Sequence, residues 1–197
     1  NIENQIFKKF MHFVEHMRLF YSLVSRGYEG FINGSESVAE GIVNSEKTGE
    51  FQEFLKDNGI IYNLYSCEVD GRKAIYCHFE NQDVDFFKVA STGTRSLALF
   101  YYWYIKMHEA SFVFIDEFDA FYHFELSENV EKCLKEIDGV QIFTTTHNTD
   151  LMSNDLLRPE CYYILNDNKI KPISELTEKE LRFAHNLQKM YKAGAFN

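Results

Sequence analysis

FVFIDE, residues 112–117, is the most informative segment of this sequence for its architecture. Its four apolar residues are too few for a helix, and aromatic and β-branched side chains favour a buried strand. Two consecutive carboxylates, Asp116 and Glu117, follow this strand directly. Charges at the edge of a buried sheet cost free energy unless they are paired or bind a ligand. This pair is therefore the first candidate for a functional site.

Helices and short strands alternate on both sides of this stretch. Helical periodicity predicts helices over residues 95–107 and 126–137, and short apolar runs predict strands over residues 112–115 and 140–144. Strands joined by a helical crossover lie parallel in a sheet, and ligands bind outside the carboxyl ends of such strands. The second half of the chain is therefore predicted to be an α/β layered domain with a mainly parallel sheet.

The N-terminal region has a different pattern. Apolar residues from Ile6 to Val24 recur at alternating spacings of 4 and 3, which predicts one helix over residues 6–24. Residues 33–50 are polar and contain several glycines, which favours a flexible connection, and a short helix is expected over residues 51–57.

A β-hairpin is expected between these two regions. The strand-like runs 60–69 and 72–79 flank Asp70-Gly71, a pair that readily adopts the positive φ angles of a tight turn. The two runs are therefore predicted to pair in an antiparallel arrangement.

Composition limits the classes of protein to which the chain can belong. Its 20 basic and 30 acidic side chains give a formal charge of −10, which argues against a surface that coats nucleic acid generally. No apolar run approaches the roughly 18 residues of a membrane helix. The first residues lack a secretory pattern, and the four cysteines form no CxxC pair, so reduced thiols, no membrane contact and a cytoplasmic location are expected.

A turn rich in hydroxyl groups precedes the predicted helix over residues 95–107. It comprises Ser91, Thr92, Gly93 and Thr94. The free N–H groups at a helix N-terminus attract anions, so this turn could bind a phosphate. A simple Ser/Thr helix cap is the alternative interpretation.

His147 follows the second predicted strand and lies in the sequence TTTH, residues 144–147. Because this strand is predicted to neighbour the Asp116-Glu117 strand, His147 could hydrogen-bond a phosphate oxygen or an attacking water. Asp116 could hold Mg²⁺ through water, and Glu117 could orient and deprotonate a water molecule.

A metal-dependent nuclease or phosphatase is an alternative function for these side chains. Carboxylates and imidazoles suit Mg²⁺ or Mn²⁺ and can polarise water. The set for such a site would be Asp116, Glu117, Asp119, His123 and His147.

The Ser91–Thr94 turn, the Asp116-Glu117 pair and Thr146-His147 occur in an order and spacing that resemble the C-terminal half of an ABC-type ATPase. Within that superfamily the residues are most similar to the branch of SMC-like proteins, OLD-family ATPases and abortive-infection AAA ATPases. The resemblance implies a layered P-loop NTPase fold that uses ATP and Mg²⁺. It also implies a helical arm or lid segment with a flexible connection over residues 1–58, and the C-terminal ATPase half over residues 59–197.

The resemblance also implies roles for these residues. Ser91, Thr92, Gly93 and Thr94 would form the signature motif, which binds the ATP of a second subunit, so that ATP lies sandwiched in a homodimer.

For the carboxylate pair and the histidine the implied roles are hydrolytic. Asp116 would be the Walker B carboxylate that holds the metal, Glu117 the catalytic base, and His147 the switch histidine. The implied reaction is hydrolysis of ATP to ADP and phosphate, with Glu117 activating the water.

A Walker A phosphate-binding loop, GxxxxGK[ST], is not found in the sequence. In the nearest stretch, Gly41–Thr48, Glu46 stands where the second glycine should be. We therefore expect an N-terminal Walker A half of the same protein to be missing from this chain, which begins with Asn1, and we expect this chain alone to be inactive. For the ATPase we expect DNA or an effector protein as a partner and phage defence as the setting. A further alternative is an ATP-gated, non-catalytic binding module that recruits a partner effector.

Overall fold

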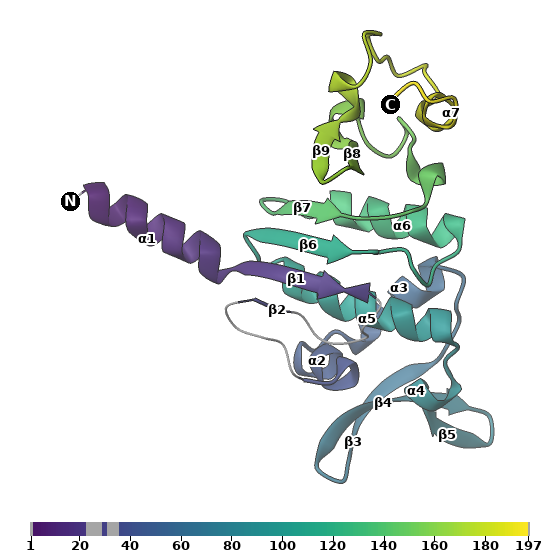
Figure 1. Ribbon diagram of the computed structural model, residues 1–197. Helices are drawn as coiled ribbons and strands as arrows, with labels where there is room; N and C mark the ends of the chain where they lie inside the picture. Colours follow the sequence, from purple (N-terminus) through teal and green to yellow (C-terminus); the bar gives the residue numbers. More distant parts are fainter. Residues whose placement is uncertain (1, 23–28, 31–35, 197) are drawn as a thin grey trace.

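A four-stranded sheet lies at the centre of the structure (Figure 1). This computed structural model describes residues 2–22, 29–30 and 36–196. The strands lie in the order β2 (Glu29–Gly30), β1 (Met17–Tyr21), β6 (Phe112–Asp116) and β7 (Gln141–Thr144). β1, β6 and β7 run parallel, whereas β2 pairs antiparallel with β1. The predicted α/β class with a mainly parallel sheet is confirmed.

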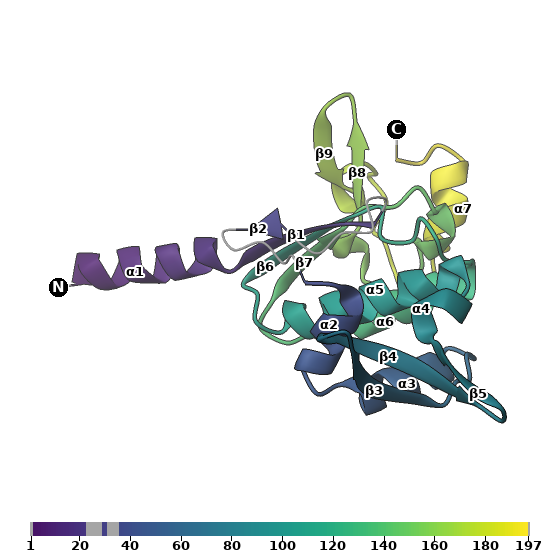
Figure 2. The ribbon, with the colours of Figure 1, turned by 90° about the horizontal axis from the view of Figure 1, so that it is seen from below.

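Two helices, α5 (Thr92–Met107) and α6 (Phe124–Lys135), cover one face of this sheet (Figure 2). Val113 and Ile115 of β6 are buried in the same core as Leu97 of α5 and Val130 of α6. Since side chains alternate along a strand, the intervening residues of β6 point to the opposite face.

That opposite face of β1 and β6 forms an apolar groove of about 780 Å³. Its lining includes Met17, Leu19, Phe112 and Phe114 and extends to Asp116. Among the residues that the structure describes, no helix covers this face (Figure 2), and β7 is an edge strand of the sheet. Parallel sheets normally have both faces covered, so this face is suited to packing against a further layer.

The N-terminal segment differs from the prediction of a helix over residues 6–24. Helix α1 (Ile2–Glu15) ends before Met17, and the chain continues as strand β1. Its Ile6, Phe10 and Phe13 are exposed, so no core contact favours extending the helical pattern. The parallel hydrogen bonds that β1 makes with β6 favour a strand instead. Residues 23–24 of the predicted helix lie outside the described residues.

The predicted flexible connection over residues 33–50 contains regular structure. It includes α2 (Val38–Asn44) and the start of α3 (Thr48–Asp57), whereas residues 33–35 lie outside the described part. A capping box explains where α2 begins, because the Ser37 hydroxyl accepts from the Glu40 N–H and the Glu40 carboxylate accepts from the Ser37 N–H.

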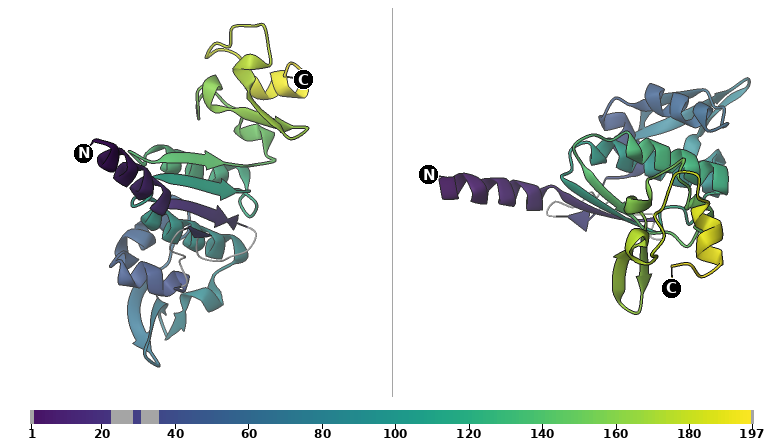
Figure 3. Two further views of the ribbon diagram at one scale, coloured as in Figure 1. Left: turned by 60° about the vertical axis from the view of Figure 1, so that its left-hand side comes forward. Right: turned by 90° about the horizontal axis from the view of Figure 1, so that it is seen from above.

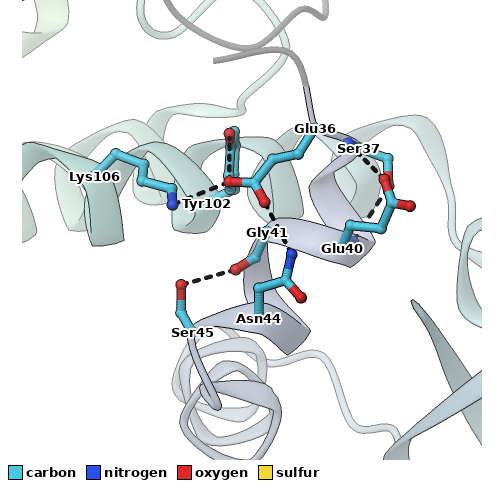
Figure 4. A network of polar contacts seen from close by, with 8 residues as sticks. All are labelled: Glu36, Ser37, Glu40, Gly41, Asn44, Ser45, Tyr102 and Lys106. Atoms are coloured by element: carbon cyan, nitrogen blue, oxygen red, sulfur yellow. Dashed lines mark hydrogen bonds and ion pairs between the residues drawn. The ribbon is translucent and has the colours of Figure 1, made fainter. Parts of the chain in front are cut away.

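Glu36, which lies just before α2, is joined to α5 by polar contacts drawn in Figure 4. The Glu36 carboxylate accepts a hydrogen bond from the Tyr102 hydroxyl at 3.3 Å and pairs with the Lys106 ammonium at 3.0 Å. Gly41 faces the fully buried Tyr102 ring so closely that an added Cβ would overlap with the ring. This glycine therefore sets how closely the two helices approach.

The predicted hairpin is confirmed and has a third strand. β3 (Leu64–Val69), β4 (Arg72–Phe79) and β5 (Gln82–Asp85) form an antiparallel sheet, followed by α4 (Phe86–Val89). Asp70 and Gly71 in the first turn have φ angles of 53° and 74°.

The C-terminal part forms a small unit beyond β7 (Figure 3). This unit has its own apolar core. It contains the hairpin of β8 (Tyr163–Asn166) and β9 (Lys169–Pro172), the short helix α7 (Leu187–Lys192), and 3₁₀ turns at Thr149–Leu151, Pro159–Cys161 and Ile173–Glu175. Ile173, Leu187 and Phe196 are buried in this core. None of the described helices is long and apolar enough to span a membrane.

Candidate functional site

One residue, Thr145, connects the ends of β6 and β7. Its N–H donates to the Ile115 carbonyl at 3.0 Å, and its carbonyl accepts from the Phe118 N–H at 3.1 Å. Its hydroxyl donates to Asp116 Oδ1 at 2.7 Å and accepts from the Glu117 N–H at 2.8 Å. A single threonine therefore hydrogen-bonds four consecutive residues at the carboxylate end of the central strand.

Glu117 lies directly after β6 in an unusual backbone conformation. Its φ angle is 46°, in the left-handed region, which costs a residue with a Cβ about 1–2 kcal/mol. Such strain persists only where surrounding contacts maintain it, and it is concentrated at functional sites. The bond from the Glu117 N–H to Thr145 is one of those contacts.

His147 lies beside Glu117, as the sequence predicted for neighbouring strand ends. Its Nε2 is 3.5 Å from Glu117 Oε1. The His147 side chain is 92% exposed and that of Glu117 is 35% exposed. The pair therefore lies at the surface, where a substrate can reach both groups.

The Ser91–Thr94 turn forms the N-terminal end of α5. Ser91 is the N-cap, and its Oγ accepts from the Thr94 N–H at 3.2 Å and contacts Thr94 Oγ1 at 2.9 Å. A Cβ added to Gly93 would have only ordinary contacts, the nearest being the Phe121 carbonyl oxygen at 3.9 Å. Packing within the chain therefore does not require a glycine at this position.

The Ser91–Thr94 turn and the carboxylates belong to neighbouring but separate parts of the site. Among the described residues, no hydrogen bond or ion pair joins this turn to Glu117 or His147. The link between the two parts is indirect: the Tyr122 hydroxyl donates to the Ser96 carbonyl of α5 at 3.1 Å. This bond ties the turn that follows β6 to the helix that begins at Thr92.

Asp119 lies close enough to Glu131 of α6 for its charge to act on that residue. Its charge is the second cause, after burial, that raises the pKa of Glu131, to about 7, and of Tyr122. Within the described ranges, no three His, Cys, Asp or Glu side chains gather closely enough to hold a metal ion. The five-residue metal set expected for a nuclease or phosphatase, which also included His123, is therefore not assembled in this structure.

Thr145 is the member of the site that the sequence did not identify. The residue lies in TTTH, but nothing in that pattern distinguishes its hydroxyl from those of Thr144 and Thr146. Its position directly after a strand end was the only signal. The contacts that distinguish it depend on which residue of β6 lies opposite, and this is set by the register Ile115↔Thr144.

A comparison with known families places the chain in a family. Residues 23–153 match the family described as "AAA domain, putative AbiEii toxin, Type IV TA system". The matched range is more than half of the chain and includes the Ser91–Thr94 turn, the Asp116-Glu117 pair and His147. No curated protein matches the sequence. The chain therefore belongs to this AAA-domain family and is a nucleotide-binding module of the P-loop ATPase type.

Proposed function

We propose that this chain supplies the hydrolytic groups of an ATPase that converts ATP and water to ADP and phosphate. The observation that carries the proposal is the position of Asp116 and Glu117 at the carboxyl end of the central parallel strand, with His147 beside Glu117. In open α/β sheets, this end of the strands is where ligands bind. The AAA-domain family supports ATP as the nucleotide.

Asp116 is the residue that would hold Mg²⁺. Its Oδ1 is occupied by the hydrogen bond from Thr145, and no protein hydrogen bond to Oδ2 is found among the described residues. The ion commonly binds proteins through one or two carboxylates and completes its shell with water and substrate phosphates, so one carboxylate fits. When bound, Mg²⁺ would neutralise charge that develops on the phosphates.

Glu117 is the proposed general base. Its carboxylate would orient the attacking water and accept its proton, and the His147 imidazole, 3.5 Å from Glu117 Oε1, would hydrogen-bond the water or a phosphate oxygen. The Ser91–Thr94 turn would bind the ATP of a second subunit, so that a homodimer forms when ATP binds.

The phosphate-binding loop would come from an N-terminal Walker A half of the same protein, with residues 1–58 as arm or lid and residues 59–197 as the C-terminal half. The sequence contains no GxxxxGK[ST] motif. The apolar groove on β1 and β6 and the edge strand β7 are surfaces against which a strand and a helix of that half could pack. We propose phage defence as the setting, with DNA or an effector protein as the further partner.

The test compares Glu117→Gln with a control, Glu109→Gln, in the protein that includes the Walker A half. Glu109 is exposed, and among the described residues its side chain makes no hydrogen bond or ion pair with Asp116, Glu117 or His147. Since a general base contributes roughly 10²- to 10⁴-fold, Glu117→Gln should lower kcat by at least about 100-fold. ATP-dependent association should remain. Unchanged turnover would refute the proposal, and association by the unaltered protein without any turnover would favour the non-catalytic module.

A further inference from the structure

We propose that Thr145 is a positioning residue that holds Asp116 and Glu117 in their working orientations. This inference rests on the proposed ATPase function, because it assigns a role to a residue that supports the two carboxylates. It starts from the four hydrogen bonds that Thr145 makes to residues 115–118.

The Thr145 hydroxyl performs two tasks that require opposite hydrogen-bonding roles. It donates its proton to Asp116 Oδ1 and accepts the Glu117 N–H on a lone pair. Among side chains of this size, only Ser and Thr offer a donor and an acceptor on one atom. Thr is the stiffer of the two, because its branched Cβ restricts rotation about χ1.

The bond to Asp116 fixes the plane of that carboxylate. With Oδ1 held by Thr145, Oδ2 keeps one orientation and stays available to a cation. Hydrogen bonds to metal ligands commonly serve this purpose, and their removal costs roughly 10- to 100-fold in metal affinity or activity.

The bond to the Glu117 N–H acts on the backbone. Glu117 has a φ angle of 46°, which residues other than glycine seldom adopt. Without an acceptor at Thr145, the peptide can relax towards a negative φ angle, and the carboxylate would then move relative to Asp116 and His147. One hydroxyl thus fixes the orientation of both carboxylates, and its removal should disturb both of them.

The experiment compares Thr145→Val, Thr145→Ser and the control Thr177→Val in the protein that includes the Walker A half. Valine keeps the shape of threonine but has no hydroxyl, whereas serine keeps the hydroxyl. Thr177 also accepts a backbone N–H, that of Lys179 at 3.3 Å, but lies in the C-terminal unit. The readouts are kcat and KM for ATP, the thermal midpoint, and Mn²⁺ affinity measured by electron paramagnetic resonance with ATP present.

Thr145→Val should lower kcat and weaken Mn²⁺ binding, each by roughly 10- to 100-fold, with little change in KM. Thr145→Ser should stay within about threefold of the unaltered protein, as should Thr177→Val. If Thr145→Val does not fold, Thr145→Ala makes the same comparison, because it also lacks the hydroxyl and needs less space.

Two results would overturn the inference: normal kcat and Mn²⁺ affinity in Thr145→Val, or equal losses in Thr145→Ser and Thr145→Val. The Glu117→Gln variant, measured in parallel, distinguishes a failure of the role of Thr145 from a failure of the proposed ATPase function. If Glu117→Gln abolishes turnover while Thr145→Val does not change it, only the role of Thr145 fails. If Glu117→Gln leaves turnover intact, the proposed function fails and the role of Thr145 fails with it.

Discussion

The pKa of Glu131 makes the stability of this protein depend on pH in a way that one substitution can test. Glu131 lies partly buried on α6, and burial, reinforced by the charge of Asp119, raises its pKa from 4.5 to about 7, while Lys135 opposes the change. At 1.36 kcal/mol for each pKa unit, ionising Glu131 costs about 3 kcal/mol more in the folded chain than in the unfolded chain.

The direction of the effect follows from proton binding. Between about pH 4.5 and 7 the folded chain keeps the Glu131 proton while the unfolded chain releases it, so the folded state binds more protons. Stability therefore falls as the pH rises through this window, and the loss is complete above about pH 7. Glutamine is neutral throughout, so Glu131→Gln removes this loss. The unfolding free energy of Glu131→Gln should exceed that of the unaltered protein only slightly at pH 4.5 and by about 3 kcal/mol at pH 8.

The assay is urea unfolding at pH 4.5, 6 and 8, followed through the fluorescence of Trp103, which is buried in the core and is the single tryptophan. The control is Glu125→Gln, at an exposed position on the same helix, which should show no comparable gain with pH. If the difference in unfolding free energy between Glu131→Gln and the unaltered protein stays constant from pH 4.5 to 8, the prediction is wrong, because the folded chain then ionises Glu131 without penalty.

Two further predictions concern packing and the link between α5 and the turn after β6. Gly41→Ala should destabilise the protein by roughly 1–3 kcal/mol in urea unfolding, because the new Cβ would collide with the buried Tyr102 ring. The control Gly49→Ala, with open space around it, should be neutral or stabilising. Equal changes in unfolding free energy for the two variants would contradict this prediction. Tyr122→Phe should lower the unfolding free energy by about 1 kcal/mol through loss of the bond to the Ser96 carbonyl, and a thermal midpoint identical to that of the unaltered protein would argue against that bond.

Local patterns were enough to predict several elements of the fold. The run of apolar residues at 112–115 predicted a strand, and the structure extends it to Asp116. The pair Asp70-Gly71 predicted a tight turn, and both residues have positive φ angles. In each case a few adjacent residues carry the signal, because a short apolar run and a turn pair such as Asp-Gly are recognised from the segment itself.

The N-terminal segment shows where a local pattern is insufficient. The apolar residues from Ile6 onwards fit a helical period through Val24, yet Met17–Tyr21 form a strand. A helix and a strand can both place some of these side chains in contact with a core. The choice between them was made by pairing with β6, a strand that lies almost 100 residues further along the chain.

The strand over residues 112–115, its carboxylate pair and the position of His147 after the next strand could all be predicted from the amino-acid sequence. How these groups are arranged depends on the tertiary structure. The parallel register of β6 and β7 brings Thr145 against four residues at the end of β6, and the left-handed conformation of Glu117 accompanies those bonds. It also placed Asp119 near Glu131, and among the described residues it did not assemble the predicted metal set. The physical reason is that hydrogen bonds and charges act over a few ångströms in space, and only folding determines which distant residues come that close.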